Sequence, residues 1–431
     1  MATATRIWSA LSPRTRTAAA VLLLAVSTLP LLSRQYIGKT QSDLSVYMHG
    51  IEALLQGRLY DGHIFEYPPY ALIWFLAPYA WAPDDLQGFR FAFGLEIWLF
   101  DAAIKAVLLW RAFRTRSGFP DLIPFLVYSL GSAALGHLLL MRYDAIPGAL
   151  ALFGVLALAG GYAVTGGALT MLAAGTKAYP ALFIPILAIA AWRRGPSDFR
   201  RFVVGVSAAG APLLLLAAWM PWWNFASFHG TRGLEVESFA ASVIWALHHV
   251  AGVDATWSLV GTSNELGGPL ADALLGPARI LWIVSTLAAF GVAILSTLRM
   301  TRSTGQTAAP AIAMQMLLTV LAFVATNIVL SPQFHLWLIP LAALMLEGRR
   351  NLPPQAVRAA WLTFLATLLV PAFVPHKQFG AGLGGPLTAV LLLRNTLLLY
   401  ATACLARAAF AILSVSAPSQ KPDHEGVRSQ S

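Results

Sequence analysis

The sequence predicts an all-α protein that crosses a membrane many times. Of its 431 residues, 58% are hydrophobic and only 11% are charged, and the mean hydropathy is +0.67. In soluble proteins about a quarter of the residues are charged, so this composition lies far outside their range. The formal net charge is +10, but the basic residues fall in short clusters between apolar runs. That pattern is typical of cytoplasmic loops and argues against a nucleic-acid partner.

Apolar runs define the expected membrane spans, because crossing about 30 Å of hydrocarbon takes about 20 helical residues. The longer runs lie at 18–33, 88–110, 119–140, 203–221, 277–298, 308–329, 358–374 and 387–411. Shorter candidates lie at 67–83, 146–161, 163–176, 178–192 and 333–347. Together they predict about 12 crossings, within a range of 11–13. The first run is followed by no signal-peptide cleavage site, so we expect it to be retained as a span.

The basic clusters orient these spans, because Lys and Arg gather in cytoplasmic loops. The clusters assigned to the cytoplasm are Arg111/Arg114/Arg116, Arg193/Arg194/Arg200/Arg201, Arg299/Arg302 and Arg349/Arg350/Arg358. Both termini are then cytoplasmic in a plasma membrane, if the proline-bearing run 67–83 is a re-entrant or shoulder segment rather than a full span. The segments left outside are 34–66, the Arg142–Asp144 turn, 222–276 and the Ser331–His335 turn. The candidate functional residues therefore gather on one face.

The chain contains no sign of a separate soluble module. We expect one transmembrane domain over 1–411 and a polar, disordered cytoplasmic tail over 412–431. The single cysteine, Cys404, excludes an internal disulfide and a thiolate metal site. The sequence also lacks G-x-x-x-x-G-K-[ST], G-x-G-x-x-G, D-x-D and Cys/His metal spacing. The sequence therefore has no recognised motif for binding a soluble nucleotide. Any activated donor is expected to arrive through the lipid.

Asp43 is the candidate catalytic base in the first external segment. A carboxylate at the membrane surface can take a proton from an incoming hydroxyl, provided that neighbours hold it in place and keep it ionised. The alternative is a solvated loop acid or a helix N-cap, since S-D-x-x-x-Y can also open a short helix.

Charges at the ends of later apolar runs give further candidates. Arg142 and Asp144 flank a turn, where they are either functional or a mutual ion pair. Lys177 splits two apolar runs and has no acidic neighbour in sequence, so its ammonium either meets a phosphate or reaches the lipid headgroups. By contrast, Asp101 and Lys105 are four residues apart in one span, and we expect them to form a structural ion pair.

The external segments toward the C-terminus carry the remaining candidates. In R-G-L-E-V-E-S, Arg232 can clamp a phosphate bidentately, while Glu235 and Glu237 can meet sugar hydroxyls. Two alternating carboxylates are also a weak signal for a divalent cation. In S-P-Q-F-H, Gln333 and His335 are expected on the same external face of the membrane as the other candidates. His335 can donate a hydrogen bond to a phosphate there. The same residues also read as the start of a helix, with Ser331 as N-cap and Pro332 at the first helical position.

The order of these fragments resembles glycosyltransferase family 87, membrane enzymes of the GT-C fold that include polyprenyl-phosphate-mannose-dependent α-mannosyltransferases. The fragments that carry the resemblance are Asp43-x-x-x-Tyr47, Gly57-x-x-Tyr60, Tyr67-Pro68-Pro69, Arg142-x-Asp144, Lys177-x-Tyr179-Pro180, R-G-L-E-V-E-S and S-P-Q near Trp337. They span about 40 to 340. The first external segment departs from the paired acids of several GT-C enzymes, because Asp43 stands alone there. We therefore expect no metal and no other cofactor.

The resemblance implies transfer of a hexose, mannose above all, from a polyprenyl-phosphate donor to a glycolipid or lipoglycan acceptor, with inversion. Asp43 would be the general base. The implied phosphate-binding residues are Lys177, Arg232, His335 and Arg142, and the implied sugar-binding residues are Tyr47, Tyr67, Asp144, Glu235, Glu237 and Gln333. The alternatives are a polyprenyl-phospho-arabinose-dependent or glucose-dependent transferase, a transporter or flippase of a polyprenyl-linked lipid, and an assembly scaffold. Candidates clustered on one face argue against transport, which would need a polar path through the midplane.

Overall fold

The computed structural model describes residues 13–32, 42–59, 65–114, 119–218, 221, 223, 232–260, 263–300, 308–372 and 384–414. Some sequence predictions fall outside these ranges. They include the tail from 415 onward, the ends of two basic clusters at Arg116 and Arg302, and parts of the external segments 34–66 and 222–276.

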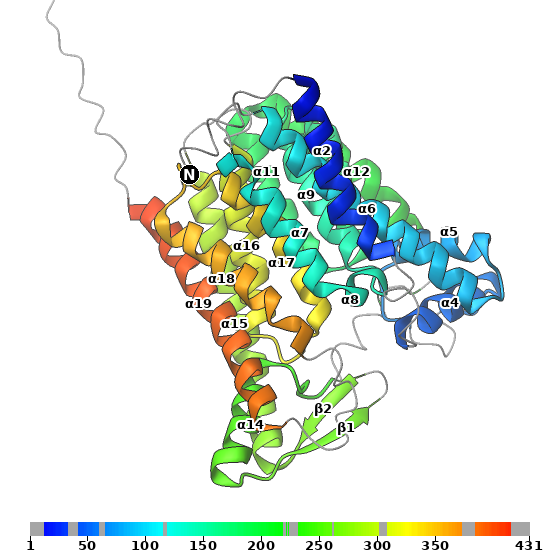
Figure 1. The fold of residues 1–431 in the computed structure, drawn as a ribbon, viewed down its shortest axis with the longest axis vertical. Helices are drawn as coiled ribbons and strands as arrows, with labels where there is room; N and C mark the ends of the chain where they lie inside the picture. Colours follow the sequence, from blue (N-terminus) through cyan, green and yellow to red (C-terminus); the bar gives the residue numbers. More distant parts are fainter. Residues whose placement is uncertain are drawn as a thin grey trace, which may run out of the picture.

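Most described residues form helices that pack side by side in a bundle (Figure 1). The α-helices are α2 (Pro13–Thr28), α4 (Ser42–Leu55), α5 (Ala71–Trp81), α6 (Leu86–Arg114), α7 (Ile123–Leu135), α8 (His137–Leu140), α9 (Ala145–Ala159), α10 (Ala163–Thr176), α11 (Phe183–Arg194), α12 (Pro196–Ala217), α14 (Phe239–Ala251), α15 (Pro269–Arg299), α16 (Ala308–Ala325), α17 (His335–Glu347), α18 (Pro354–Leu368) and α19 (Gly385–Ser414). Short 3-10 turns are η1 (Leu29–Leu32), η2 (Phe119–Leu122), η3 (Tyr179–Leu182), η6 (Pro332–Phe334) and η7 (Val370–Ala372). Each predicted apolar run coincides with one or more of these elements, so the predicted helix positions are confirmed.

Within the described chain, five helical segments are long and apolar enough to cross a membrane. They are Pro196–Ala217, Pro269–Arg299, Ala308–Ala325, Pro354–Ala372 and Gly385–Ser414. Shorter apolar helices pack beside them, so the protein is a mostly helical membrane protein, as the composition predicts. Helix α5, with 11 residues, is only about 16 Å long. That length fits a shoulder better than a full span, but the number of crossings stays a prediction.

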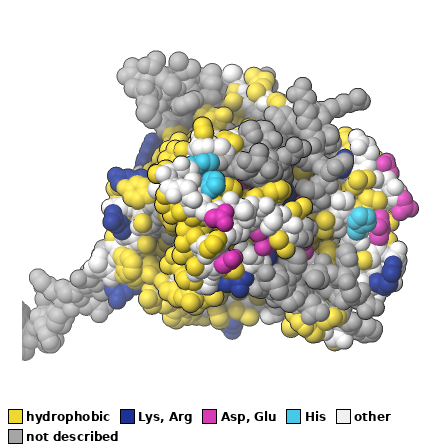
Figure 2. Space-filling model, turned by 90° about the horizontal axis from the view of Figure 1, so that it is seen from below, with side chains coloured by type: hydrophobic (Ala, Val, Ile, Leu, Met, Phe, Trp, Pro, Cys, Tyr) yellow, Lys and Arg dark blue, Asp and Glu magenta, His cyan; other side chains and the backbone are white. Residues whose placement is uncertain are grey.

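The two ends of the bundle differ in the side chains that they carry. At one end, basic side chains tie neighbouring helices together. Arg111 forms two hydrogen bonds of 2.7 Å to the carboxylate of Glu347, and Arg193 Nη2 donates to the carbonyl of Met300 at 2.9 Å. The other end carries α14 and the external segments. Seen from that side, acidic side chains lie among hydrophobic ones (Figure 2). Which end faces the cytoplasm stays a prediction.

The expected external segments are more ordered than loops, and this corrects the all-α prediction. Segment 222–276 contains α14 and an antiparallel hairpin of β1 (Thr256–Val260) and β2 (Ser263–Gly267), paired from Thr256 opposite Gly267 to Val260 opposite Ser263. The run T-W-S-L-V favours a strand because it is rich in β-branched and aromatic residues. Segment 34–66 contains α4, whose first turn holds Asp43. S-D-x-x-x-Y therefore does open a helix, but Asp43 lies within its first turn and is not the N-cap.

Small residues let α10 and α12 pack with their backbones nearly in contact. A Cβ added at Gly205 would lie 2.0 Å from the Val164 carbonyl oxygen, and one added at Gly167 would lie 2.2 Å from that of Phe202. Between membrane helices, such close approach replaces the hydrophobic driving force that water supplies elsewhere. This contact holds α10, whose last turn leads directly into Lys177.

We predict that Gly205→Ala lowers stability by about 1–3 kcal/mol, because the added methyl group must push two helices apart. Thermal unfolding in detergent measures the effect. The matched control is Gly291→Ala on α15, where an added Cβ meets nothing within 4 Å. Its unfolding temperature should be unchanged or slightly higher. Equal unfolding temperatures for the two variants would contradict the close α10–α12 contact.

Candidate active site

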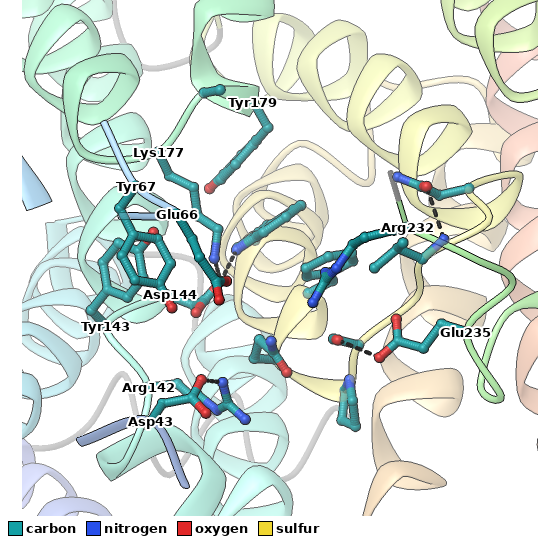
Figure 3. A pocket seen from close by; sticks show the side chains of 18 of the residues that line it. Asp43, Glu66, Tyr67, Arg142, Tyr143, Asp144, Lys177, Tyr179, Arg232 and Glu235 are labelled. Atoms are coloured by element: carbon teal, nitrogen blue, oxygen red, sulfur yellow. Dashed lines mark hydrogen bonds and ion pairs between the residues drawn. The ribbon is translucent and has the colours of Figure 1, made fainter. Parts of the chain in front are cut away.

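A cavity of about 370 Å³ opens at the hairpin end of the bundle. Helix ends surround it, because α10 and α16 finish there while α9 and α17 begin there. The charged side chains that line it are Asp43, Glu66, Arg142, Asp144, Lys177, Arg232, Glu235 and Glu237. Residues that are far apart in sequence thus meet in one site (Figure 3). Every residue predicted to be functional lines this cavity except His335.

Asp43 forms an ion pair with Arg142. Asp43 comes from the first turn of α4, and Arg142 from the turn between α8 and α9. Both side chains are mostly buried yet remain open to the cavity, with 17% and 16% of their surface exposed. Burial lowers the pKa of Arg142 to about 10, and the charges of Asp144 and Glu235 oppose that shift. Arg142 is therefore still a cation at neutral pH, and it stabilises the Asp43 carboxylate as an anion.

Asp144 pairs with Lys177 and not with Arg142, so the interpretation of Arg142 and Asp144 as a mutual ion pair is wrong. Lys177 has no acidic neighbour in sequence, but the fold supplies one. Lys177 Nζ lies 2.5 Å from Asp144 Oδ1. Trp337 Nε1 donates to the same oxygen at 2.7 Å. Burial lowers the pKa of Lys177, and the Asp144 carboxylate opposes that shift. The pair is invisible in sequence because its members come from α9 and from the end of α10.

Aromatic rings form the wall around the Lys177 ammonium. Its Nζ lies 4.7 Å from the ring centroid of Tyr143 and 5.0 Å from that of Trp337. The Trp337 ring stacks on Tyr179 at a centroid distance of 4.1 Å and on Phe334 at 4.0 Å. Faces of aromatic rings attract a cation, which adds to the carboxylate in holding the ammonium in place.

Two tyrosines from the first external region complete the same wall. Tyr47 stacks on Phe75 at 4.2 Å, and Tyr67 meets Tyr143 edge to face at 5.0 Å. The backbone before α5 is fixed beside them, because the Tyr70 N–H donates to the Gly175 carbonyl at 2.9 Å. A Cβ at Gly175 would lie 2.2 Å from the Tyr70 ring, so this approach requires glycine. The Tyr67-Pro68-Pro69 segment is therefore held against the end of α10, next to Lys177.

The segment 232–238 crosses the opposite side of the cavity, first alongside β2 and then through a turn at 236–237, where the Ser238 N–H donates to the Glu235 carbonyl at 2.9 Å. It pairs with β2, since the Leu266 N–H donates to Leu234 at 2.8 Å and the Val236 N–H to Asn264 at 3.0 Å. Glu235 and Glu237 line the cavity, while Leu234 and Val236 are buried in the hydrophobic core. This pairing explains how a polar external segment presents several charges in fixed positions.

Glu235 and Glu237 have different surroundings. Ser331 Oγ donates to Glu235 Oε1 at 2.8 Å. Burial and the neighbouring charge of Glu237 raise the pKa of Glu235 to about 7, which the charges of Arg232 and Arg142 and the Ser331 hydrogen bond partly oppose. Glu237 instead pairs with the fully buried Arg394 at 2.6 Å. Its carboxylate is thus engaged by the protein.

Arg394 is a residue that the sequence analysis missed. It lies in α19, where its Nη2 and the Asn395 side-chain amide both donate to the Glu237 carbonyl, at 2.9 and 3.0 Å. A single Arg-Asn step inside the apolar run 387–411 was the available signal, because a charge within a span needs a partner. Other lining residues that were missed are Glu66, Asn264, Trp282, Phe323 and Asn327.

His335 does not reach the cavity, and its predicted role as a phosphate-binding residue is wrong for this geometry. Its side chain is fully buried, and Nδ1 lies 3.0 Å from the Thr367 hydroxyl of α18. At the start of α17, Gln333, Phe334 and Trp337 line the cavity, while position 335 faces the neighbouring helix.

The residues described here contain no group of three or more His, Cys, Asp or Glu side chains arranged to hold a metal ion. Glu235 and Glu237, the pair that the sequence offered for a divalent cation, bind Ser331 and Arg394 respectively. Whether the activity depends on a metal stays a prediction.

We predict that Asp144→Asn destabilises the protein by about 3–5 kcal/mol, because it leaves the buried Lys177 ammonium without its carboxylate. The double variant Asp144→Asn/Lys177→Met should lose less unfolding free energy than the two single variants lose in sum. Unfolding in detergent, followed for the wild type and these three variants, tests the pairing. Strictly additive effects would contradict it.

No protein-family model matches the chain, and comparison with curated proteins finds no match. Among solved structures, it is similar to ArnT from Cupriavidus metallidurans bound to undecaprenyl phosphate, with 15% identity, a TM-score of 0.47, and coverage of 92% of this chain and 77% of that one. The apo state of ArnT gives 13% identity, a TM-score of 0.44, and coverage of 92% and 76%. A likeness at this level assigns neither fold family nor activity, so the resemblance to glycosyltransferase family 87 stays a prediction.

Proposed function

We propose that this protein is a membrane glycosyltransferase of the GT-C fold, which moves a sugar from a polyprenyl-phosphate donor to an acceptor hydroxyl. The observation that carries the proposal is the single cavity that joins Asp43 to Lys177, Arg232 and Arg142. The cavity lining holds both kinds of group that such a transfer requires, a carboxylate as base for the hydroxyl and cations for the phosphate.

A lipid-linked donor suits the surroundings of the cavity. Trp282 of α15 and Phe323 of α16 form an apolar part of its lining. On α15, the neighbouring side chains Ile280 and Leu281 are 65% and 59% exposed, as expected for a surface that faces hydrocarbon. A polyprenyl chain can therefore lie against α15 while its phosphate reaches the charged groups. The lack of nucleotide-binding motifs agrees with this route.

In the proposed reaction, Asp43 accepts the proton of the acceptor hydroxyl as the hydroxyl oxygen attacks the anomeric carbon. The bond between that carbon and the phosphate oxygen breaks on the opposite side, so the configuration inverts. Arg142 holds the Asp43 carboxylate in place and keeps it ionised before the attack. A base positioned in this way contributes about 10²–10⁴-fold to a rate.

The phosphate is proposed to bind between Arg232 and Lys177, whose side chains enter the cavity from opposite walls (Figure 3). Arg232 offers a planar guanidinium that can hold two phosphate oxygens. Lys177 is partly neutralised by Asp144, so it supplies a fixed dipole more than a free charge. Arg142 adds positive charge near the reacting atoms.

The sugar is proposed to lie between the aromatic wall and the polar side opposite. Tyr47, Tyr67 and Trp337 offer ring faces, and Asp144, Glu235 and Gln333 offer hydrogen-bond partners. We propose mannose as the sugar, a glycolipid or lipoglycan as acceptor, and the outer face of the plasma membrane as the site of transfer. These finer points rest on the motif order and on the positions of the basic clusters; arabinose and glucose remain the alternatives to mannose.

The test is to incubate purified protein with radiolabelled polyprenyl-phosphate-mannose and a panel of membrane glycolipids, and to identify what becomes labelled. Parallel reactions with arabinose and glucose donors compare the sugars. Labelling by none of them, together with lipid scrambling in reconstituted vesicles, would replace this proposal with a transporter.

We predict that Asp43→Asn reduces the transfer rate by about 10²–10⁴-fold, because the amide cannot accept the proton. The control is Glu52→Gln, the same kind of change on the same helix at a residue outside the described cavity lining. It should transfer at the wild-type rate. A folded Asp43→Asn protein with wild-type activity would remove Asp43 as the base.

A further inference from the structure

Glu235 has a carboxylate oxygen that the described protein leaves without a partner inside the cavity. Ser331 donates to Oε1 at 2.8 Å, while Oε2 is buried and has no hydrogen-bond partner among the described residues. The side chain is 93% removed from solvent, since its exposed fraction is 7%. A buried, unpartnered carboxylate oxygen is costly unless it carries a proton or meets a ligand.

This carboxylate lies next to the proposed phosphate position. Arg232 is three residues away on the same segment, and both side chains point into the same space (Figure 3). The segment is fixed from several directions. The Glu235 N–H donates to Ile328 at 2.9 Å, and the carbonyl of Arg232 accepts from Arg279 of α15 at 2.5 Å. A phosphate held by Arg232 would therefore lie beside Glu235.

The charges around Glu235 favour its neutral form once an anion enters. The neighbouring acid Glu237 is paired with Arg394 of α19, and Glu265 of β2 accepts the Gly233 N–H at 2.9 Å. Arg232 and Arg142 are the cations that act on Glu235, and burial raises its pKa to about 7. A bound phosphate would offset those cations and raise this pKa further. The described groups that face Glu235 thus permit it to carry a proton at neutral pH.

We propose that protonated Glu235 is the general acid that delivers a proton to the departing phosphate. This inference rests on the proposed function and completes its proton balance. The acceptor O–H gives its proton to Asp43, the new bond forms between that oxygen and the anomeric carbon, and the bond from that carbon to the phosphate oxygen breaks. Glu235 transfers its proton to the phosphate as it leaves. The products are the glycosylated acceptor and a polyprenyl phosphate monoanion, and proton exchange with water resets both carboxyl groups.

Glu235 fits this role better than Asp144, Glu237 or Asp43. Asp144 is bound by Lys177 and Trp337, and Glu237 by Arg394, so both carboxylates are already engaged by the protein. Asp43 is paired with Arg142 and serves as the base. Two carboxyl groups that act as base and as acid need different surroundings. The base needs a nearby cation that keeps it ionised, and the acid needs a buried position with few partners for its charged form. Asp43 and Glu235 have these two kinds of surroundings.

A binding experiment tests whether Glu235 takes up a proton when a phosphate binds, and it requires no turnover. The probe is a polyprenyl methyl phosphate, a phosphodiester whose single negative charge does not titrate near neutral pH. Calorimetry at pH 7.5 in buffers of different ionisation enthalpy counts the protons taken up. Wild-type protein and the control Glu52→Gln should take up on the order of half a proton per bound lipid. Glu235→Gln should bind the probe but take up none. Equal uptake by Glu235→Gln would overturn the proposal.

The kinetic prediction is a 10-fold to 100-fold lower kcat for Glu235→Gln, at the low end of general-acid effects, because a phosphate with a second pKa of about 6 is already a good leaving group. The donor KM should change by less than about threefold. In wild-type protein, kcat/KM should fall as the pH rises through about 7, the pKa of Glu235 in the free protein, and kcat should fall at a higher pH, because the bound phosphate raises that pKa and the acid must be protonated to act. Glu235→Gln should lose this alkaline decline, and Glu235→Asp should retain it.

The outcomes separate the two proposals. A wild type that transfers sugar, beside a Glu235→Gln variant with unchanged kcat and the same alkaline decline, overturns only the role of Glu235. A raised KM at unchanged kcat would make Glu235 a binding residue, which also overturns it. If the wild type transfers no sugar from any donor, the proposed function fails and the general acid fails with it. Proton uptake that disappears in Glu235→Gln would then still establish a proton-sharing phosphate site.

Discussion

The structure of the cavity depends on the neutralisation of buried charge by residues from distant parts of the chain. Asp43 pairs with Arg142, Asp144 with Lys177, and Glu237 with Arg394. Removing one partner of a pair would leave the other charge unpaired in surroundings of low dielectric, which is strongly unfavourable. The pairs therefore tie α4 to the turn before α9, the start of α9 to the end of α10, and the segment 232–238 to α19. Rigid placement of charge is also what electrostatic catalysis requires, because the groups need no rearrangement during the reaction.

Helix packing determines which of these charges can meet. The close contact of α10 with α12 positions the end of α10, and the contact of Tyr70 with Gly175 fixes the external segment there. The hairpin supports the segment 232–238 from one edge, while the Ile328 carbonyl binds it from the other. The described parts of segments 34–66 and 222–276 thus form a structured cover over the helix ends. A lipid-linked substrate would meet a site that is already formed, and little binding energy would be spent on ordering it.

The sequence predicts the helices well because a membrane span must satisfy its backbone within itself, which makes the signal local. It also predicts that Asp43, Arg142, Lys177 and Arg232 share one end of the bundle, since the side follows from the order of spans. It does not predict their partners. Lys177 has no acid near it in sequence, and Arg394 lies more than one hundred residues from Glu237. His335 was misassigned because the direction of a side chain at a helix start depends on the neighbouring helices.

Exposure separates two kinds of charge that look alike in the sequence. Asp101 and Lys105 pair at 2.6 Å within α6, with both side chains fully buried, and Lys105 also donates to the Ser27 carbonyl at 2.7 Å. That pair is sealed among helices and serves packing, as its spacing predicts. Asp43, Arg142 and Lys177 instead keep 16–18% of their side-chain surface open to the cavity. A charged side chain that is paired on one side and open to the cavity on the other is held in place by its partner. It can still bind a substrate, because the substrate can compete with that partner. Glu235 and Glu237 are about equally buried, so their partners separate them: Arg394 engages the Glu237 carboxylate, while Oε2 of Glu235 has no hydrogen-bond partner among the described residues.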